Sequence, residues 1–265
     1  MTTTPKAGGW PRSRLILLVA SVAATAVALV VGLGLAVWFA LAPTPTVASG
    51  PAPVADAGDR GDAYRDQIAA QPMLQVPTSA ASTPSVAADV GPTMTLPDAT
   101  SVGEAGVASG FPHTPEGAVA QLAAIEVTVV EAMSVPTAHQ VHAAWALPGG
   151  VTASGWAMTR NVQSFLTTAG SLGNTRDDSV FVSASPAAAQ VKGVDGPDWV
   201  LACVLLDVRA TIVADARIGY GHCERMQWTD GRWMIGPGVP PARAPSVWPG
   251  SELAIEAGWR TLTDG

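Results

Sequence analysis

The sequence predicts an α+β domain that follows an N-terminal transmembrane helix. Three observations predict it: an uncharged apolar run over residues 15–42, three segments of helical period between residues 115 and 170, and strand-like alternation after Asn174. Strands that follow helices without alternating with them favour an antiparallel sheet. The expected order is a cytoplasmic tail (1–14), a transmembrane helix (15–42), a Pro/Ala-rich linker (43–109) and an extracytoplasmic α+β domain (110–265).

The anchor prediction rests on length and on flanking charge. The run of 28 uncharged residues exceeds the ~20 that a helix needs to cross a bilayer. Lys6, Arg12 and Arg14 are the only charges before it, so the positive-inside tendency places the N-terminus in the cytoplasm. A cleaved secretory signal is the competing interpretation, because small residues follow at 47–50. The apolar core of a signal is only ~7 to 15 residues long, which favours a retained single-pass anchor in the cell membrane.

The charge balance argues against nucleic acid as a direct ligand. All 21 acidic residues lie beyond the anchor, against 11 lysines and arginines, so the exported part carries about −10 formally. A surface of that sign repels phosphate backbones.

The linker prediction follows from composition. Residues 43–109 hold nine prolines and a single aromatic residue, Tyr64, which is too little apolar mass for a separate core. One short helix is expected within it at 62–71, capped by Asp62 and ended by Pro72. This helix either docks onto the domain or a partner, or it is a transient turn.

Helix signals open the domain. Thr114 is an N-cap candidate with Pro115 at the first helical position, and Val135 before Pro136 marks the end of that helix. A second helix is expected from Thr137 to about residue 147. A third is expected within 152–170.

Strand signals follow. Short strands are expected at 179–184 and 188–192, on either side of Pro186, and longer ones at 199–212 and 217–228. Asp230 and Gly231 predict a two-residue hairpin turn that sets Trp228 across from Trp233. From Gly236 the chain is Pro-rich, and Ser251 caps a last helical turn.

The two cysteines, Cys203 and Cys223, predict a disulfide between the two long strands, because a pair outside the membrane is more often bridged than free. For the two to face each other, the turn must be centred near Val213. The preferred turn residue is Asp215, so either a bulge intervenes or the pair is offset.

No catalytic, cofactor or metal residues are predicted. His139 and His142 are three apart but lack further ligands, and no nucleophile-elbow, zincin, P-loop or dinucleotide motif occurs. Acidic residues in or beside the strands have arginines as the simpler cross-strand partners. These acids are Asp207, Asp215 and Glu224, and the arginines are Arg209, Arg217 and Arg225. The protein is therefore not expected to be an enzyme.

Trp248 and Trp259 lie in the Pro-rich tail and are the predicted partner surface. The alternative is that they pin the tail to the sheet.

Three strings carry a family resemblance: residues 110–119 (GFPHTPEGAV), 219–228 (GYGHCERMQW) and 231–234 (GRWM). They resemble an uncharacterised group of actinobacterial single-pass membrane proteins associated with conjugative or integrative elements. The layout also resembles the bridge components of type IV secretion machines. That resemblance implies an exported domain of the nuclear-transport-factor-2-like cone type, in which a curved antiparallel sheet wraps the helices.

The resemblance implies a non-enzymatic structural component of a conjugative DNA-transfer or type IV secretion-like apparatus. Its anchor, residues 15–42, would lie in the lipid bilayer, and its exported domain would dock other membrane or secretion-apparatus proteins or further copies of itself. The alternative is an extracytoplasmic ligand-binding module with a pocket between the sheet and the first helix. An enzyme would need titratable residues converging on that pocket.

Overall fold

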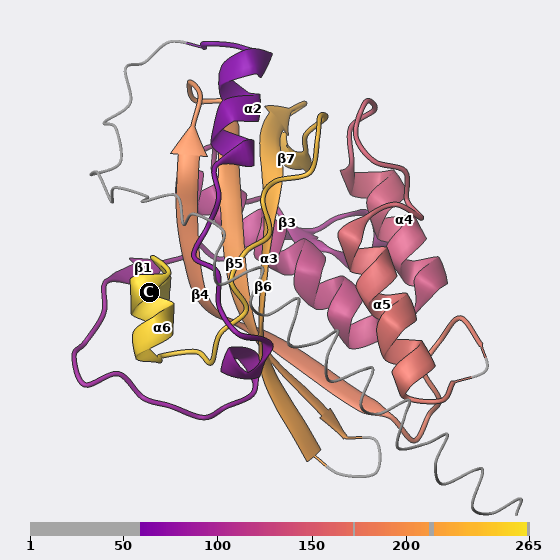
Figure 1. Cartoon of the computed structure of the whole chain (residues 1–265). Helices are drawn as coiled ribbons and strands as arrows, with labels where there is room; N and C mark the ends of the chain where they lie inside the picture. Colours follow the sequence, from indigo (N-terminus) through magenta and orange to yellow (C-terminus); the bar gives the residue numbers. More distant parts are fainter. Residues whose placement is uncertain (1–58, 172, 212–214, 264–265) are drawn as a thin grey trace, which may run out of the picture. The chain divides into compact units, whose positions relative to one another are not determined.

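A six-stranded sheet in the order β1-β8-β4-β5-β6-β7 organises the chain (Figure 1). The computed structural model describes residues 59–171, 173–211 and 215–263, which all belong to one compact unit. The strands are β1 (Thr93–Thr95), β4 (Phe181–Val194), β5 (Trp199–Thr211), β6 (Asp215–Thr229), β7 (Arg232–Ile235) and β8 (Arg260–Thr263). The α+β class is therefore confirmed.

The sheet is mixed, so the prediction of a wholly antiparallel sheet is wrong. Strand β1 pairs with β8 in parallel, with Thr93 opposite Thr261. The other pairs of this sheet are antiparallel. The parallel pair joins two segments more than 160 residues apart in sequence, so no local pattern could have indicated it.

The predicted tail and anchor, residues 1–42, lie outside the described residues. Within the described ranges, no helix has both the length and the apolar character needed to cross a bilayer.

From residue 59 onward, the segment predicted as a linker is part of the folded body. The expected short helix is confirmed as α2 (Asp62–Ala70), although Gly61 rather than Asp62 occupies the N-cap. Ile68 and Ala69 are buried in a cluster with Trp199 and Leu201 of β5. The segment then forms the 3-10 turn η1 (Thr78–Ala81), β1, and a small hairpin of β2 (Ser101–Val102) and β3 (Ala108–Ser109). A proline-rich segment needs no core of its own when an existing sheet offers it an apolar face.

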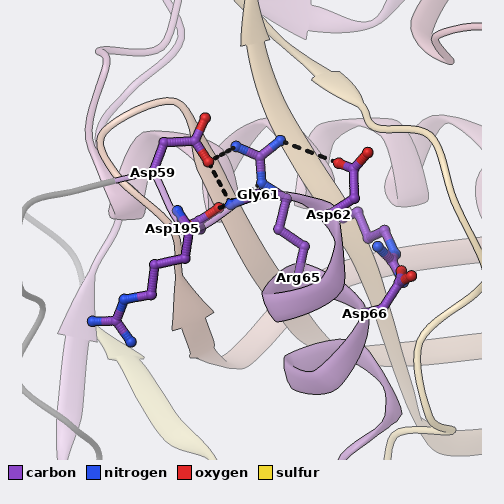
Figure 2. A network of polar contacts seen from close by, with 8 residues as sticks. Asp59, Gly61, Asp62, Arg65, Asp66 and Asp195 are labelled. Atoms are coloured by element: carbon purple, nitrogen blue, oxygen red, sulfur yellow. Dashed lines mark hydrogen bonds and ion pairs between the residues drawn. The ribbon is translucent and has the colours of Figure 1, made fainter.

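Polar contacts fix α2 to the turn between β4 and β5 (Figure 2). Arg65 Nε donates to Asp195 Oδ2 at 2.7 Å, and Arg65 Nη2 pairs with Asp59 at 2.9 Å. Burial alone would raise the pKa of Asp195, but the N–H of Arg60 and the guanidinium of Arg65 outweigh it and lower that pKa. On the other side of the helix, Asp66 accepts from Arg225 of β6 at 2.7 Å.

Three helices form the layer on one face of the sheet: α3 (Pro115–Ala132), α4 (Val135–Trp145) and α5 (Ala157–Thr168) (Figure 1). The predicted Thr114 cap is confirmed, because its hydroxyl accepts from the N–H of Gly117 at 3.1 Å. The predicted Thr137 cap of the second helix is wrong, since Ser134 is the N-cap and accepts from Thr137. Proline is tolerated in a first helical turn, so Pro136 lies just inside the second helix.

The central strand β5 is buried on both faces. Alternate residues, among them Val200, Val204 and Leu206, pack into the core under the helices. The residues between them, such as Cys203 and Leu205, pack under the N-terminal and C-terminal segments on the outer face. Burial on both faces explains why the sequence of this strand is continuously apolar.

The two strands expected on either side of Pro186 are one strand, β4. Its register with β5 shifts between Pro186 and Ala188, and its other neighbour, β8, pairs only with Ala188 and Ala189. A proline is accommodated at such a bulge, where its missing N–H breaks no regular ladder.

Two turn predictions have clear outcomes. The Asp230-Gly231 hairpin is confirmed: both residues have positive φ, and Trp228 lies opposite Trp233 with ring centroids 5.4 Å apart. Between β5 and β6 the register is continuous down to Thr211 opposite Asp215. Asp215 therefore begins β6 and accepts from the Thr211 hydroxyl at 2.6 Å.

Candidate functional site

A cavity of about 430 Å³ lies beside β6, between the helical layer and two segments that pack on the outer face of the sheet. It is lined by the last turns of α3, by α5, by β5 and β6, and by two segments remote in sequence, 74–81 and 243–246. Its apolar walls include Val130, Met133, Val162, Phe165, Val208 and Ile218. Small-molecule sites typically measure roughly 300–1,000 Å³ and are mostly apolar, so the cavity has the size and the walls of a binding site.

Two glycines of β6 place the C-terminal tail at this cavity. A Cβ on Gly219 would lie 1.8 Å from the carbonyl oxygen of Val247, and one on Gly221 would lie 2.5 Å from that of Pro245. Only glycine permits this close approach of two backbones. The N–H of Gly221 also donates to Ser246 Oγ at 3.0 Å. The tail therefore packs directly on β6 and supplies Arg243, Ala244, Pro245 and Ser246 to the cavity lining.

The Tyr220 hydroxyl is the inner polar group of the cavity. It accepts from Asn161 Nδ2 at 2.7 Å and donates to Met158 Sδ at 3.3 Å. A thioether is a weak acceptor, so an oxygen of a ligand would be a better partner for this proton. Burial, reinforced by the nearby Glu126, raises the pKa of Tyr220, so the hydroxyl keeps its proton.

Arg243 is the single charged side chain among the lining residues. It is exposed and stands at the mouth together with the exposed Asn161 and Ser164. The cavity thus has apolar walls, a neutral hydrogen-bond donor inside and a cation at its rim.

A buried polar cluster lies near Tyr220. Glu224 and His222 share the helix-facing side of β6 with Tyr220, because alternate residues of a strand point the same way. Glu224 Oε1 accepts from Trp156 Nε1 at 2.7 Å and lies 2.9 Å from His222 Nε2. Glu126 of α3 is fully buried, and neither of its carboxyl oxygens has a hydrogen-bond partner among the described residues. Burial, and then the charge of Glu224, raise the pKa of Glu126 well above its ordinary value.

Replacing Glu126 with Gln is expected to reduce the pH dependence of the unfolding free energy. Because the folded-state pKa is raised, the folded chain holds a proton that the unfolded chain releases above its ordinary pKa of about 4.5. Stability from this group is complete below that pH and is lost as pH rises toward the folded-state pKa, by at most about 1.4 kcal/mol per pH unit. Urea denaturation between pH 5 and 8 measures the effect.

The stability of the Glu126→Gln variant relative to the native protein should grow with pH over that range. Glu116→Gln is the matched control, because Glu116 lies exposed in the first turn of the same helix. A difference between Glu126→Gln and the native protein that stays constant with pH would contradict the prediction.

The acids singled out from the sequence have different partners. Asp207 pairs with Arg217 of β6 at 2.7 Å, as the cross-strand interpretation expects, and with Arg209 of its own strand at 3.4 Å. Glu224 does not pair with Arg225, which instead contacts Asp66 and the carbonyl of Val239.

His139 and His142, the two histidines considered as metal ligands, lie on α4, near α5. Burial lowers the pKa of His142, whose ring lies 5.4 Å from that of Trp156. His139 lies three residues earlier on the same helix, and its Nε2 is buried without a hydrogen-bond partner among the described residues.

Cys203 and Cys223 are joined by a disulfide and lie opposite each other in the β5–β6 register. Their side chains point to the outer face of the sheet, where Cys223 contacts Met73. The predicted pair is confirmed, and no bulge or offset separates the two strands here.

Trp259 is buried, so its prediction as partner surface is wrong. It is 1% exposed, and its indole N–H donates to the carbonyl of Pro245 at 3.2 Å. It pins the tail to the sheet, which was the alternative interpretation. Trp248 is half-buried and lies 4.4 Å beneath the guanidinium of Arg217.

Asn161, Tyr220 and Arg243 were not predicted as site residues, because they come from separate segments and meet only in the fold. Glu126 was not predicted either, although the sequence carries a signal for it. Glu126 follows Leu122 by four residues and precedes Val130 by four, so it lies on the buried face of an otherwise apolar helix.

Together, the fold and the cavity define an α+β domain with a mixed sheet and a ligand-sized cavity beside β6. No protein-family model, curated protein or solved structure matches this chain.

Proposed function

We propose that this domain binds a small, largely apolar molecule in the cavity beside β6. The observation that carries the proposal is the cavity itself. Its volume is about 430 Å³, its walls are apolar, and the proton of the Tyr220 hydroxyl has only a thioether as its acceptor. Of the expected roles, the ligand-binding module is the one that this geometry supports.

The proposal explains why two remote segments meet at one place. Residues 74–81 and 243–246 line the cavity opposite the helices. The backbone N–H of Trp248 donates to the carbonyl of Ala80 at 2.7 Å, so a hydrogen bond joins the two parts of the chain next to the cavity. Under the predicted topology, the anchor at 15–42 would place this cavity on the extracytoplasmic side of the membrane.

The role in a DNA-transfer or secretion apparatus remains a separate proposal. In the chain, α3 to α5 precede β4 to β7, as the helices precede the sheet in the cone-type domains that the sequence resembles. The register shifts of β4 are of the kind that bend strands, which supports a curved sheet. Mild crosslinking in cells should recover other membrane-channel or transport proteins with this chain, and recovery of this chain alone would contradict the role.

Filling the cavity tests ligand binding. Ser164→Trp places an indole at a lining position of α5, and it is expected to weaken binding of 1-octanol at least tenfold. Gln163→Trp is the matched control, because Gln163 is the exposed preceding residue of the same helix and does not line the cavity. Calorimetric titration of the full chain in lipid nanodiscs, with empty nanodiscs subtracted, measures both. Equal binding by the two variants would exclude the cavity as the site.

A further inference from the structure

We infer that the ligand is an amphiphile with a single negative charge, whose carboxylate lies at Arg243 and whose apolar part fills the cavity. This inference rests on the proposed function and adds the chemical class of the ligand. It is carried by the state of Arg243, by the donors around it and by the distribution of charge along the cavity.

Arg243 is the one arginine of the described chain whose guanidinium has no partner there. Four arginines form ion pairs with acids: Arg65, Arg209, Arg217 and Arg225. Others donate to backbone carbonyls: Arg160, Arg176, Arg232 and Arg260. Arg60 lies over the ring of Tyr64. Arg243 has no such contact among the described residues, although the exported part carries about twice as many acids as bases.

The groups around Arg243 present hydrogen-bond donors to the cavity. The Tyr220 hydroxyl has only a sulfur acceptor, and the Asn161 amide carries two N–H groups of which one is used. Arg243 lies close enough to Tyr220 to act on its pKa in the lowering direction. A carboxylate offers acceptors only, and a guanidinium can bind it through two parallel hydrogen bonds. An ammonium group would be repelled at the same position.

The charges also orient the ligand. Glu224 acts on Tyr220 from the buried polar cluster, whereas Arg243 is the only lining cation and lies at the mouth. An anionic head group is therefore favoured at the mouth, with its alkyl part against Val130, Val162 and Phe165 inside. A single arginine balances one negative charge, which favours a monoanion such as a medium-chain carboxylate.

Three ligands with the same alkyl chain test the inference: octanoate, 1-octanol and octylammonium. Calorimetric titration of the full chain in lipid nanodiscs is expected to show octanoate binding about tenfold more tightly than 1-octanol, and octylammonium binding more weakly than both. In Arg243→Gln the preference for octanoate over 1-octanol should vanish. Arg160→Gln is the control, because it removes an equal charge from an exposed residue of α5 that does not line the cavity.

The outcomes separate the two proposals. If octanoate and 1-octanol bind equally to the native chain, or if the preference survives in Arg243→Gln, the inference is overturned while cavity binding stands. If Arg160→Gln abolishes the preference as completely as Arg243→Gln, general electrostatics accounts for it and the inference also fails. If no ligand binds, or if Ser164→Trp leaves binding unchanged, the proposed function itself fails.

Discussion

Trp259→Ala is expected to lower the free energy of unfolding by about 3–5 kcal/mol, the range for truncating a fully buried tryptophan. The indole is 1% exposed and packs in the outer-face cluster with Cys203, Leu205 and Val247. Its N–H bond to Pro245 is also lost, which leaves a buried carbonyl without that donor. Chemical denaturation followed by circular dichroism measures the loss.

Trp248→Ala is the matched comparison, since both tryptophans lie in the same tail and differ in burial. Trp248 is half-buried, and the guanidinium of Arg217 lies over its ring. A cation–π contact of this kind contributes about 0.5–1 kcal/mol. Trp248→Ala is therefore expected to lower the free energy of unfolding by less than Trp259→Ala. If Trp259→Ala costs no more than Trp248→Ala, Trp259 does not hold the tail in the way its burial indicates.

The parts of the fold that sequence could predict are those determined by neighbours in sequence. Thr114 before Pro115 begins a helix because the cap and the proline act within one turn. Asp230 and Gly231 make a hairpin because both residues tolerate positive φ. The strand β5 could be predicted from the apolar composition of its own residues.

The parts that sequence could not predict depend on remote partners. The segment predicted as a linker has too little apolar mass for a core of its own, yet α2 needs to bury only Ile68 and Ala69 against Trp199 and Leu201 of β5. The pairing of β1 with β8 likewise joins two segments more than 160 residues apart in the sequence.

The candidate site was hidden for the same reason. Asn161, Tyr220 and Arg243 are ordinary residues of a helix, a strand and a loop until the tail packs on Gly219 and Gly221. The glycine-tyrosine-glycine-histidine pattern of β6 lets the tail approach on one face while Tyr220 and His222 point to the helices on the other.

Removing the Cys203–Cys223 disulfide is expected to lower the free energy of unfolding by about 3 kcal/mol, because the bridge closes a loop across 20 residues of sequence in the unfolded chain. The folded state has little need of the bond to keep the two residues together, since β5 and β6 pair without a register shift around it. The loss of stability should therefore come mainly from the greater conformational freedom of the unfolded chain without the bridge. In the folded state, Tyr220 and Glu224 on the opposite face of β6 should keep their positions.

Two forms of the protein separate loop closure from packing: the reduced native chain and the Cys203→Ala, Cys223→Ala double variant. Both lack the cross-link, but only the double variant loses the sulfur atoms that pack near Met73 and Trp259. Denaturation with and without reductant should show most of the loss already in the reduced native chain, with 1-octanol affinity unchanged at low denaturant. A reduced chain as stable as the oxidised one would mean that loop closure contributes nothing here, and that packing on the outer face alone holds the hairpin of β5 and β6.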